Sequence, residues 1–169
     1  MTLVFIAMGS DVDPSRNLPV AAGLLAKRMR VTKVSNVYST RPIGMGGARF
    51  YNCVIEADSK SSPREIKFGV LKDIEANMGR ARGKKRYEPR SIDLDLIMYG
   101  DIVADEPDLV LPDPDICTRP FLARCLYELG PALVLPGFNI KVSTLTASMG
   151  TAGMRRLPAM TVRIRGALV

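Results

Sequence analysis

The sequence contains no histidine and no tryptophan, and only 6% of its 169 residues are aromatic. The lack of histidine removes the commonest general base at neutral pH and the commonest ligand of transition metals. Any catalysis by this chain must therefore use carboxylates, cations, hydroxyls or a hard metal ion.

Cysteines are few, and long hydrophobic runs are missing. Three cysteines without a CxxC pair do not indicate a disulfide framework or a zinc site, so reduced and mostly buried thiols are expected. The apolar start of the chain is interrupted by Ser10, Asp11 and Asp13, and it lacks the basic segment of a secretory signal. These features predict a cytoplasmic protein with no membrane association.

The residues that are present suit a globular protein with an anionic partner. Hydrophobic residues make up 47% of the chain and charged residues 24%, and the length suits one domain covering residues 1–169. The formal net charge is +7 and the pI is near 9.6. A basic balance favours nucleotides, phosphates, nucleic acid or a membrane surface, and composition does not choose between them.

Hydrophobic periodicity predicts four strands and two helices in the order β-α-β-β-α-β. The strands are expected at 2–8, 31–40, 51–57 and 91–99. One helix is expected after Asp11 or Asp13 with Pro14 in its first turn, and another from about 61 to 78, opened by Ser62 and Glu65. This order predicts an α+β fold with a ferredoxin-like antiparallel sheet and helices packed on one face.

The remainder of the chain is expected to form a C-terminal extension. Residues 109–114 read as extended and residues 121–129 as a helix. Beyond residue 137 the pattern weakens, with a helix expected at 142–157 and a final strand at 160–165.

The strongest local signal is the pair Asp93 and Asp95 within an apolar strand pattern. Side chains alternate along a strand, so the two carboxylates share one face and Leu94 and Leu96 share the other. Aspartate is depleted in strands, and two neighbouring carboxylates repel each other. Mg²⁺ relieves that repulsion and typically takes one or two protein carboxylates, with phosphate oxygens as further ligands. The alternative is an edge strand with one solvated face.

A cluster of cations lies just before this pair: Arg80, Arg82, Lys84, Lys85, Arg86 and Arg90. Arginine forks bind phosphate through two hydrogen bonds, and lysine acts as a point charge. Cations followed by a carboxylate pair therefore favour a polyphosphate, which both groups hold. The alternatives are a solvated basic loop or a nucleic-acid patch, but only Tyr87 adds an aromatic ring to the cations.

A second group of residues suits a planar heterocycle. Arg41 to Gly44 forms a proline-shaped loop with free backbone groups, Phe50 offers a flat face, and Asn52 offers a paired donor and acceptor. Taken alone, this group is more typical of a core phenylalanine and a turn asparagine.

These residues together resemble the 6-hydroxymethyl-7,8-dihydropterin pyrophosphokinase family. The resemblance is carried by Arg80-x-Arg82 and the run from Tyr87 to Leu96. It continues in Gly9-Ser10, Arg41 to Gly44, Phe50 to Asn52, Leu111-Pro112 and Arg119 to Leu122, and it runs in the same order from about residue 3 to residue 137.

The resemblance implies transfer of the β,γ-pyrophosphoryl group of ATP to the hydroxymethyl group of a dihydropterin in folate biosynthesis, with release of AMP. It implies that Asp93 and Asp95 bind two Mg²⁺ ions. It further implies that the phosphates contact Arg80, Arg82, Arg90 and Arg119, and that ATP also lies near Tyr87, Leu96 and Asp113. The pterin is expected between Phe50 and Phe121, with Asn52 at its polar edge and Thr40, Pro42, Ile43 and Gly44 in the adjoining loop. Glu75 matches a position that lines the pterin and nucleotide region.

Four positions depart from the family pattern. Asp113 stands in place of a histidine, Asp11 in place of an asparagine, Tyr87 in place of a tryptophan and Glu88 in place of a glycine. The alternatives are a diverged relative that acts on another pterin, a silent paralogue that binds pterin, and an RNA-binding ferredoxin-like module. The resemblance favours ATP and a hydroxymethyl-dihydropterin as partners, without nucleic acid, in a monomer or weak homo-oligomer.

Overall fold

One antiparallel sheet organises the protein. The computed structural model describes residues 1–41, 47–79 and 91–168. The strands of the main sheet are β1 (Thr2–Ser10), β2 (Arg30–Val34), β3 (Tyr38–Thr40), β4 (Phe50–Ser59), β5 (Asp93–Tyr99) and β10 (Met154–Arg156). Their order is β10-β3-β4-β1-β5, and β2 also pairs with β4. Every pairing in this sheet is antiparallel.

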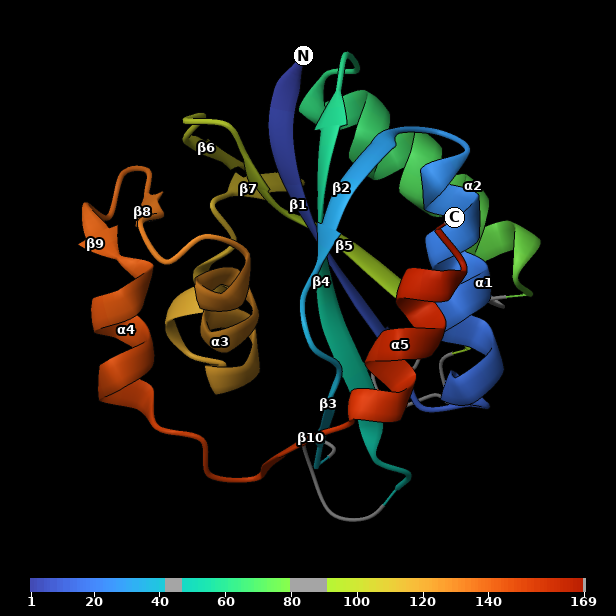
Figure 1. The fold of residues 1–169 in the computed structure, drawn as a ribbon. Helices are drawn as coiled ribbons and strands as arrows, with labels where there is room; N and C mark the ends of the chain where they lie inside the picture. Colours follow the sequence, from blue (N-terminus) through green and yellow to red (C-terminus); the bar gives the residue numbers. More distant parts are fainter. Residues whose placement is uncertain (42–46, 80–90, 169) are drawn as a thin grey trace.

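Helical segments and two small hairpins complete the fold (Figure 1). The helices are α1 (Pro14–Ala26), α2 (Lys72–Asn77), α3 (Pro120–Leu129), α4 (Val142–Met149) and α5 (Pro158–Gly166). A π-helical segment, Glu65–Leu71, runs directly into α2, and a short 3₁₀ helix, Pro114–Cys117, precedes α3. The hairpins are β6 (Ala104–Glu106) with β7 (Leu109–Leu111), and β8 (Val134–Leu135) with β9 (Ile140–Lys141).

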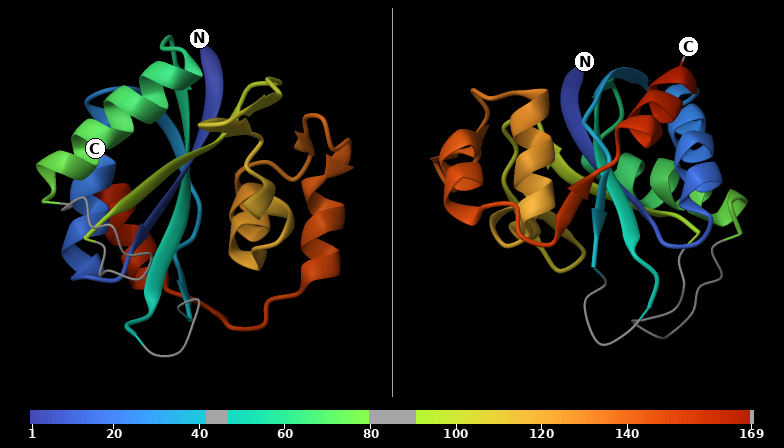
Figure 2. Two further views of the ribbon diagram at one scale, coloured as in Figure 1. Left: turned by 180° about the vertical axis from the view of Figure 1, so that it is seen from behind. Right: turned by 60° about the horizontal axis from the view of Figure 1, so that its bottom comes forward.

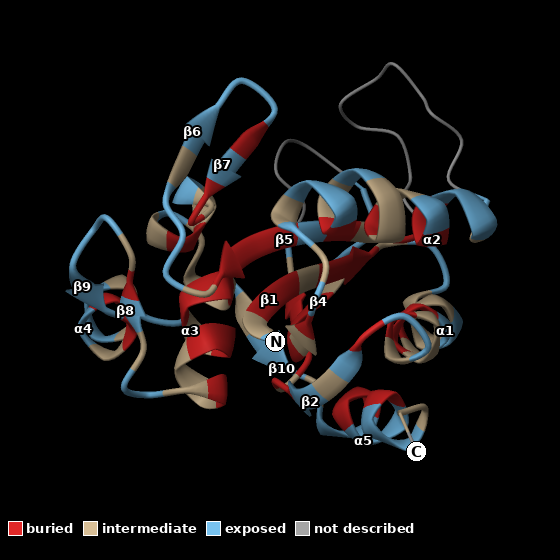
Figure 3. Ribbon diagram, turned by 90° about the horizontal axis from the view of Figure 1, so that it is seen from above, coloured by how far each residue is buried: buried red, intermediate tan, exposed pale blue. Residues whose placement is uncertain are grey.

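Helices cover both faces of the sheet. The two helices of the predicted β-α-β-β-α-β order lie on one face as expected, and helices of the C-terminal extension cover the other. In Figures 1 and 2, α1, α2 and α5 lie on one side of the sheet, and α3 and α4 lie on the other. Two cores correspond to these layers. Leu18, Ile74 and Ile164 belong to the first, and Leu126 and Leu145 belong to the second. Both faces of the central strands are therefore covered along most of their length, as Figure 3 shows for β1 and β5, and β5 is open only where Asp93 and Asp95 lie.

The central strand β1 sets the register on which the site depends. It pairs with β4 on one side and with β5 on the other, so Gly9 lies between Asn52 and Asp93. Two residues earlier, Ala7 lies opposite Asp95. The β1–β5 register shifts after Phe5, because Ile97 is an extra residue that has no partner on β1.

Most of the predicted elements in the first hundred residues are present. The strands predicted at 2–8, 51–57 and 91–99 correspond to β1, β4 and β5. The helix predicted from 61 to 78 is confirmed in its extent, with a capping box in which Ser62 N donates to Glu65 Oε2 (2.7 Å) and Glu65 N donates to Ser62 Oγ (3.3 Å). The antiparallel α+β class is therefore confirmed.

Three predictions of secondary structure need correction. The strand expected at 31–40 is broken into β2 and β3. Val37 lies at the break, where its carbonyl accepts a hydrogen bond from Leu157 N and its N–H donates to Thr161 Oγ1 of the C-terminal segment rather than to a neighbouring strand. The helix expected at 142–157 ends at Met149, before Gly150 with φ +67°. The strand expected at 160–165 is part of helix α5, which begins at Pro158.

None of the helices in the described ranges is long and apolar enough to cross a membrane.

Candidate active site

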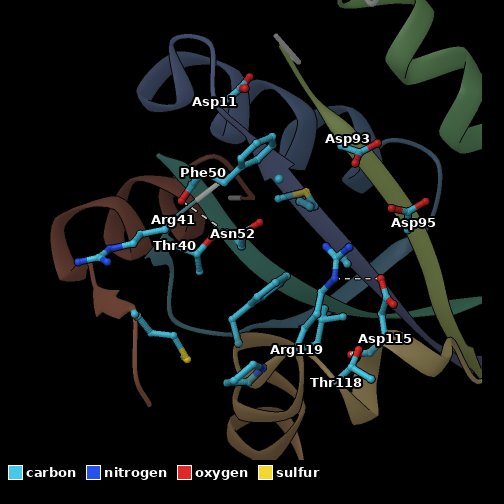
Figure 4. Close-up of a pocket in the computed structure, with 18 of the residues that line it drawn as sticks. Asp11, Thr40, Arg41, Phe50, Asn52, Asp93, Asp95, Asp115, Thr118 and Arg119 are labelled. Atoms are coloured by element: carbon cyan, nitrogen blue, oxygen red, sulfur yellow. Dashed lines mark hydrogen bonds and ion pairs between the residues drawn. The ribbon is translucent and has the colours of Figure 1, made fainter. Parts of the chain in front are cut away.

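A cavity of about 570 Å³ lies between the sheet and the start of α3. Its floor comes from β1, β3, β4 and β5, and its walls come from residues 113–122, 47–48 and 152–154. Clefts of this volume suit a small ligand. Figure 4 shows side chains from several elements pointing into this space.

Asp93 and Asp95 form the acidic end of the cavity. Both line it, whereas Leu94 and Leu96 are 2% and 3% exposed in the core behind β5. This confirms the predicted alternation of the strand. The residues opposite the two carboxylates on β1 are Gly9 and Ala7, which leave space in front of them.

A third carboxylate, that of Asp113, lines the same cavity. The backbone N–H of Asp113 donates to Ile97 O (2.9 Å), which ties this residue to β5 just beyond Asp95. The side chain accepts a hydrogen bond from Asp115 N (2.8 Å) at the start of the short 3₁₀ helix. Asp113 therefore has a capping role while it adds negative charge to the acidic end.

Burial and mutual repulsion shift the pKa values of these groups. Asp95 is exposed at the cavity, but the surrounding protein still displaces part of the water around its carboxylate. This loss of bulk water, together with the carboxylates of Asp93, Asp113 and Glu75, raises the pKa of Asp95 to about 6, against the opposing charge of Lys72. Loss of water is also the main cause that raises the pKa of Asp113. Clustered carboxylates of this kind favour a bound cation.

The donor set fits a hard cation that takes its remaining ligands from elsewhere. Asp93 and Asp95 offer carboxylate oxygens, the ligand type that Mg²⁺ prefers. Among the described residues, no three acidic or thiol side chains are grouped closely enough to hold a metal ion by themselves. A divalent cation at this pair would therefore need oxygens from water or from a bound phosphate.

Two buried side chains that the sequence did not single out as supports hold β5 in place. Glu75 Oε1 accepts a hydrogen bond from Leu94 N (2.9 Å), and Ser10 Oγ donates to Ser91 O (2.6 Å). Glu75 is 3% exposed and does not line the cavity. It therefore acts on the position of the strand, in contrast with the lining role that the resemblance implied.

The opposite end of the cavity carries an aromatic ring and an amide from β4. Phe50 and Asn52 both line it, and Asn52 Nδ2 donates to Thr40 Oγ1 (2.9 Å) on β3. Gly9 permits this arrangement, because a Cβ atom at that position would lie 3.0 Å from Asn52 Oδ1 and 3.6 Å from the Phe50 ring. Figure 4 shows Phe50, Asn52 and Thr40 grouped on one side of the cavity.

The start of α3 supplies the facing wall. Phe121 lines the cavity from the first turn of this helix. Arg119 precedes the helix and forms an ion pair with Asp115, with Nε and Oδ2 3.0 Å apart (Figure 4). The structure therefore brings Thr40, Phe50, Asn52, Asp93, Asp95, Asp113, Arg119 and Phe121 to one cavity.

Other predicted residues are not placed at this cavity. The Leu96 side chain is buried on the other face of the sheet, so only its backbone is near the acidic end. The remaining predicted residues lie outside the described residues: Pro42, Ile43, Gly44, Arg80, Arg82, Tyr87 and Arg90.

Sequence reasoning missed one wall of the cavity. Ala152, Gly153 and Met154 line it at the beginning of β10. No local sequence pattern indicates that these residues line a cavity, because the wall depends on pairing between β10 and β3, which are more than a hundred residues apart.

A family profile described as 7,8-dihydro-6-hydroxymethylpterin-pyrophosphokinase (HPPK) matches residues 5–131. The chain belongs to the HPPK family. It is 32% identical over 159 residues to the 2-amino-4-hydroxy-6-hydroxymethyldihydropteridine pyrophosphokinase of Pseudomonas aeruginosa, a match that covers 92% of this chain and 96% of that protein. The named enzyme of Bacillus subtilis is also 32% identical, with 75% and 77% coverage.

Some relatives are much longer than this chain. The mitochondrial folate synthesis bifunctional protein of Pisum sativum is 38% identical over 129 residues, covering 75% of this chain. The chain spans about a quarter of the length of that relative and of its Arabidopsis thaliana counterpart.

Solved structures support the HPPK fold. The wild-type HPPK-DHPS of Plasmodium falciparum, solved with pteroate, matches with a TM-score of 0.75 at 12% identity. The match covers 92% of this chain and 47% of that one. At this identity the likeness concerns the fold alone.

Proposed function

We propose that this chain transfers pyrophosphate from ATP to the hydroxymethyl group of 6-hydroxymethyl-7,8-dihydropterin, giving AMP and the pterin diphosphate in folate biosynthesis. The observation that carries this proposal is the cavity itself, which combines a carboxylate pair at one end with an aromatic ring and an amide at the other. Membership of the HPPK family supports the same reaction.

The acidic end suits the triphosphate. We propose that Asp93 and Asp95 would hold two Mg²⁺ ions. When bound, Mg²⁺ would neutralise charge on the phosphates. Arg119 stands at the same cavity and can exchange Asp115 for a phosphate oxygen. Arg80, Arg82 and Arg90 are proposed as further phosphate contacts, on the strength of the sequence resemblance.

The aromatic end suits the acceptor. Phe50 and Phe121 come from the floor and the facing wall, so a flat ring can lie between them. Thr40 engages the amide nitrogen of Asn52 and so leaves Asn52 Oδ1 to accept from the edge of a heterocycle. These contacts orient the hydroxymethyl oxygen towards the acidic end.

The reaction needs positioning more than covalent help from the protein. The hydroxymethyl oxygen forms a bond to the β-phosphorus and loses its proton to water or to a phosphate oxygen, the bond between the β-phosphorus and the α,β-bridging oxygen breaks, and AMP leaves with that oxygen. The absence of histidine is compatible with this chemistry.

The order of the first five main strands supports a ferredoxin-like core. With β2 and β3 taken as one interrupted strand, the order is β2/β3-β4-β1-β5, which is the arrangement of a split β-α-β pair. Both faces of this sheet are covered by helices, which disfavours the RNA-binding alternative, since such modules stack bases on an open sheet face.

A diverged pterin specificity is the second candidate, favoured by Asp113 where the family pattern has a histidine. A product assay with ATP, Mg²⁺ and several pterins tests both candidates. We expect chromatographic detection of AMP and a pterin diphosphate with the hydroxymethyl-dihydropterin. Product from a different pterin alone would favour the second candidate, and no AMP from folded protein would contradict both.

A further inference from the structure

The cavity wall at residues 152–154 belongs to a part of the chain beyond the family match, which ends at residue 131. We propose that this wall limits the size of the acceptor end, with Met154 as a specificity-determining residue and Arg49 as the residue that positions the wall. The inference rests on the proposed function, because it concerns the acceptor end of the same cavity.

Strand pairing places Met154 beside the acceptor contacts. Met154 lies directly opposite Thr40 in the β10–β3 pair, and directly opposite residues share one face of a sheet. Both residues line the cavity, and Thr40 accepts the hydrogen bond from Asn52. Only β3 therefore separates the strand of Met154 from the strand that carries the amide we assign to the edge of the pterin.

Arg49 fastens the start of β10 to β3. Its Nε donates to Ser39 Oγ (2.6 Å), and its Nη2 donates to Ser39 O (3.1 Å) and to Gly153 O (3.4 Å). Ser39 is completely buried, so the guanidinium is held against a fixed part of the sheet. A planar fork with several donors suits this role, which a single ammonium group cannot reproduce.

The other end of β10 is anchored as firmly. Leu157 N donates to Val37 O (2.8 Å), and Val37 N donates to Thr161 Oγ1 (2.9 Å). Met160 and Ile164 of the following helix α5 are buried in the core. The wall is therefore fixed on both sides by the sheet and the core.

The chemistry of the wall matches the periphery of a heterocycle. Ala152, Gly153 and Met154 present a methyl group, a hydrogen atom and a thioether, and none of these is charged. A Cβ atom at Gly153 would meet nothing within 4 Å, so the wall is not crowded at this residue. Methionine packs favourably against aromatic rings, and shortening it would widen this end of the cavity.

The substitution Met154→Ala tests the specificity role. We expect the KM for the hydroxymethyl-dihydropterin to rise about tenfold, the effect of losing one or two methylene-sized contacts, with kcat and the KM for ATP unchanged. We also expect an analogue with extra methyl groups on the pterin ring to gain in kcat/KM relative to the natural substrate. Arg155→Ala is the matched control, because Arg155 is exposed on the same strand and does not line the cavity.

The substitutions Arg49→Met and Arg49→Lys test the positioning role. We expect Arg49→Met to raise the KM for the pterin about fivefold without changing the KM for ATP, and Arg49→Lys to restore little of the loss. Full restoration by lysine would overturn the role of the fork. An unchanged pterin KM in Met154→Ala, or an equal rise in the KM for ATP, would overturn the role of the wall.

Pterin binding followed by ligand fluorescence separates this inference from the proposed function. A wild-type protein that binds the pterin but releases no AMP would contradict the proposed reaction, while weaker binding by Met154→Ala would still support the wall. Equal pterin affinity of the wild type and Met154→Ala would contradict the wall even if the wild type is active.

Discussion

At the acidic end of the cavity, both carboxylates of the predicted metal pair come from a single strand, and the period of two along β5 places them. At the aromatic end, Thr40, Phe50, Phe121 and Met154 come from β3, β4, α3 and β10. The first end is a local feature of the chain, and the second exists only when distant segments are assembled.

The acidic end therefore depends mainly on its charge, and the aromatic end mainly on its shape. The strand at the acidic end is held by the hydrogen bond that Glu75 accepts from Leu94 N and by the one that Ser10 donates to Ser91 O, so conservative changes there alter charge while the strand stays in place. The aromatic end depends on the spacing of four elements, so changes there act on the geometry that the acceptor meets. Substitutions at the two ends should therefore differ in which kinetic constant they change.

The largest effect is expected from Asp95→Asn. Loss of one carboxylate removes half of the proposed metal pair, and metal ions contribute several kcal/mol to the stabilisation of transition-state charge. We expect kcat to fall on the order of a thousandfold while the KM for the pterin changes little. The measurement is AMP release in the presence of Mg²⁺.

Asp101→Asn is the control for this prediction. Asp101 is exposed just beyond β5 and does not line the cavity, so its substitution should leave kcat unchanged. Wild-type turnover in Asp95→Asn would refute the assignment of the metal pair. A rise confined to the pterin KM would refute the division between the two ends.

An intermediate effect is expected from Phe121→Ala. A ring stacked on an aromatic side chain gains about 1–3 kcal/mol, as measured for nucleic-acid bases, so the KM for the pterin should rise roughly tenfold to a hundredfold. The KM for ATP should change much less, because the ring lies away from the acidic pair. Steady-state kinetics with each substrate varied in turn provide the measurement.

Phe138→Ala is the matched control, since Phe138 is an exposed phenylalanine that does not line the cavity. An equal loss in both variants would point to general damage to the fold. If Phe121→Ala left the pterin KM unchanged, the pterin would not lie against this wall.

The smallest effect is expected in the stability of the metal-free protein. The raised pKa of Asp95, about 6, means that the folded state binds its proton more tightly than the unfolded state. This contribution to stability is present below pH 4 and is lost as the pH rises from about 4 to about 6. Asp95→Asn avoids the loss, so at pH 7.5 without divalent cations it should melt about 2–4 °C above the wild type.

Thermal melts at pH 4 and pH 7.5, with EDTA and with Mg²⁺, check this prediction. The lowered pKa values of Glu65 and Asp108 act in the opposite direction in both proteins, so the difference between wild type and variant is the quantity to read. Mg²⁺ should raise the melting temperature of the wild type more than that of Asp95→Asn. A difference that does not change with pH would contradict the shift in Asp95.

Local periodicity was sufficient to predict the acidic end and much of the fold. The alternation of aspartate and leucine in β5 fixes which face meets the cavity, and the capping box at Ser62 and Glu65 fixes where a helix begins. The position of Asp113 could not be read in this way. It depends on the backbone bond to Ile97, which lies at the extra residue of β5.

The C-terminal segment was predicted least well, because its structure depends on tertiary contacts. The β-branched residues Val162 and Ile164 favour a strand by propensity, yet Met160, Thr161 and Ile164 are buried at helical spacing against the rest of the core. Pro158 at the first helical position was a usable signal for α5. Gly150 similarly marks the end of α4.

The bonds of Val37 to Leu157 and Thr161 have a consequence for the time course of folding during synthesis. Val37 and Thr161 are 124 positions apart in the chain. At roughly 5–20 residues per second, a ribosome needs on the order of 6–25 s to add the second residue after the first. The pair Asp93 and Asp95 can take its place once β5 has been made, whereas one edge of β3 must wait for β10, and Val37 must wait for α5. The acceptor half of the cavity is therefore the last part of the site that the growing chain can complete.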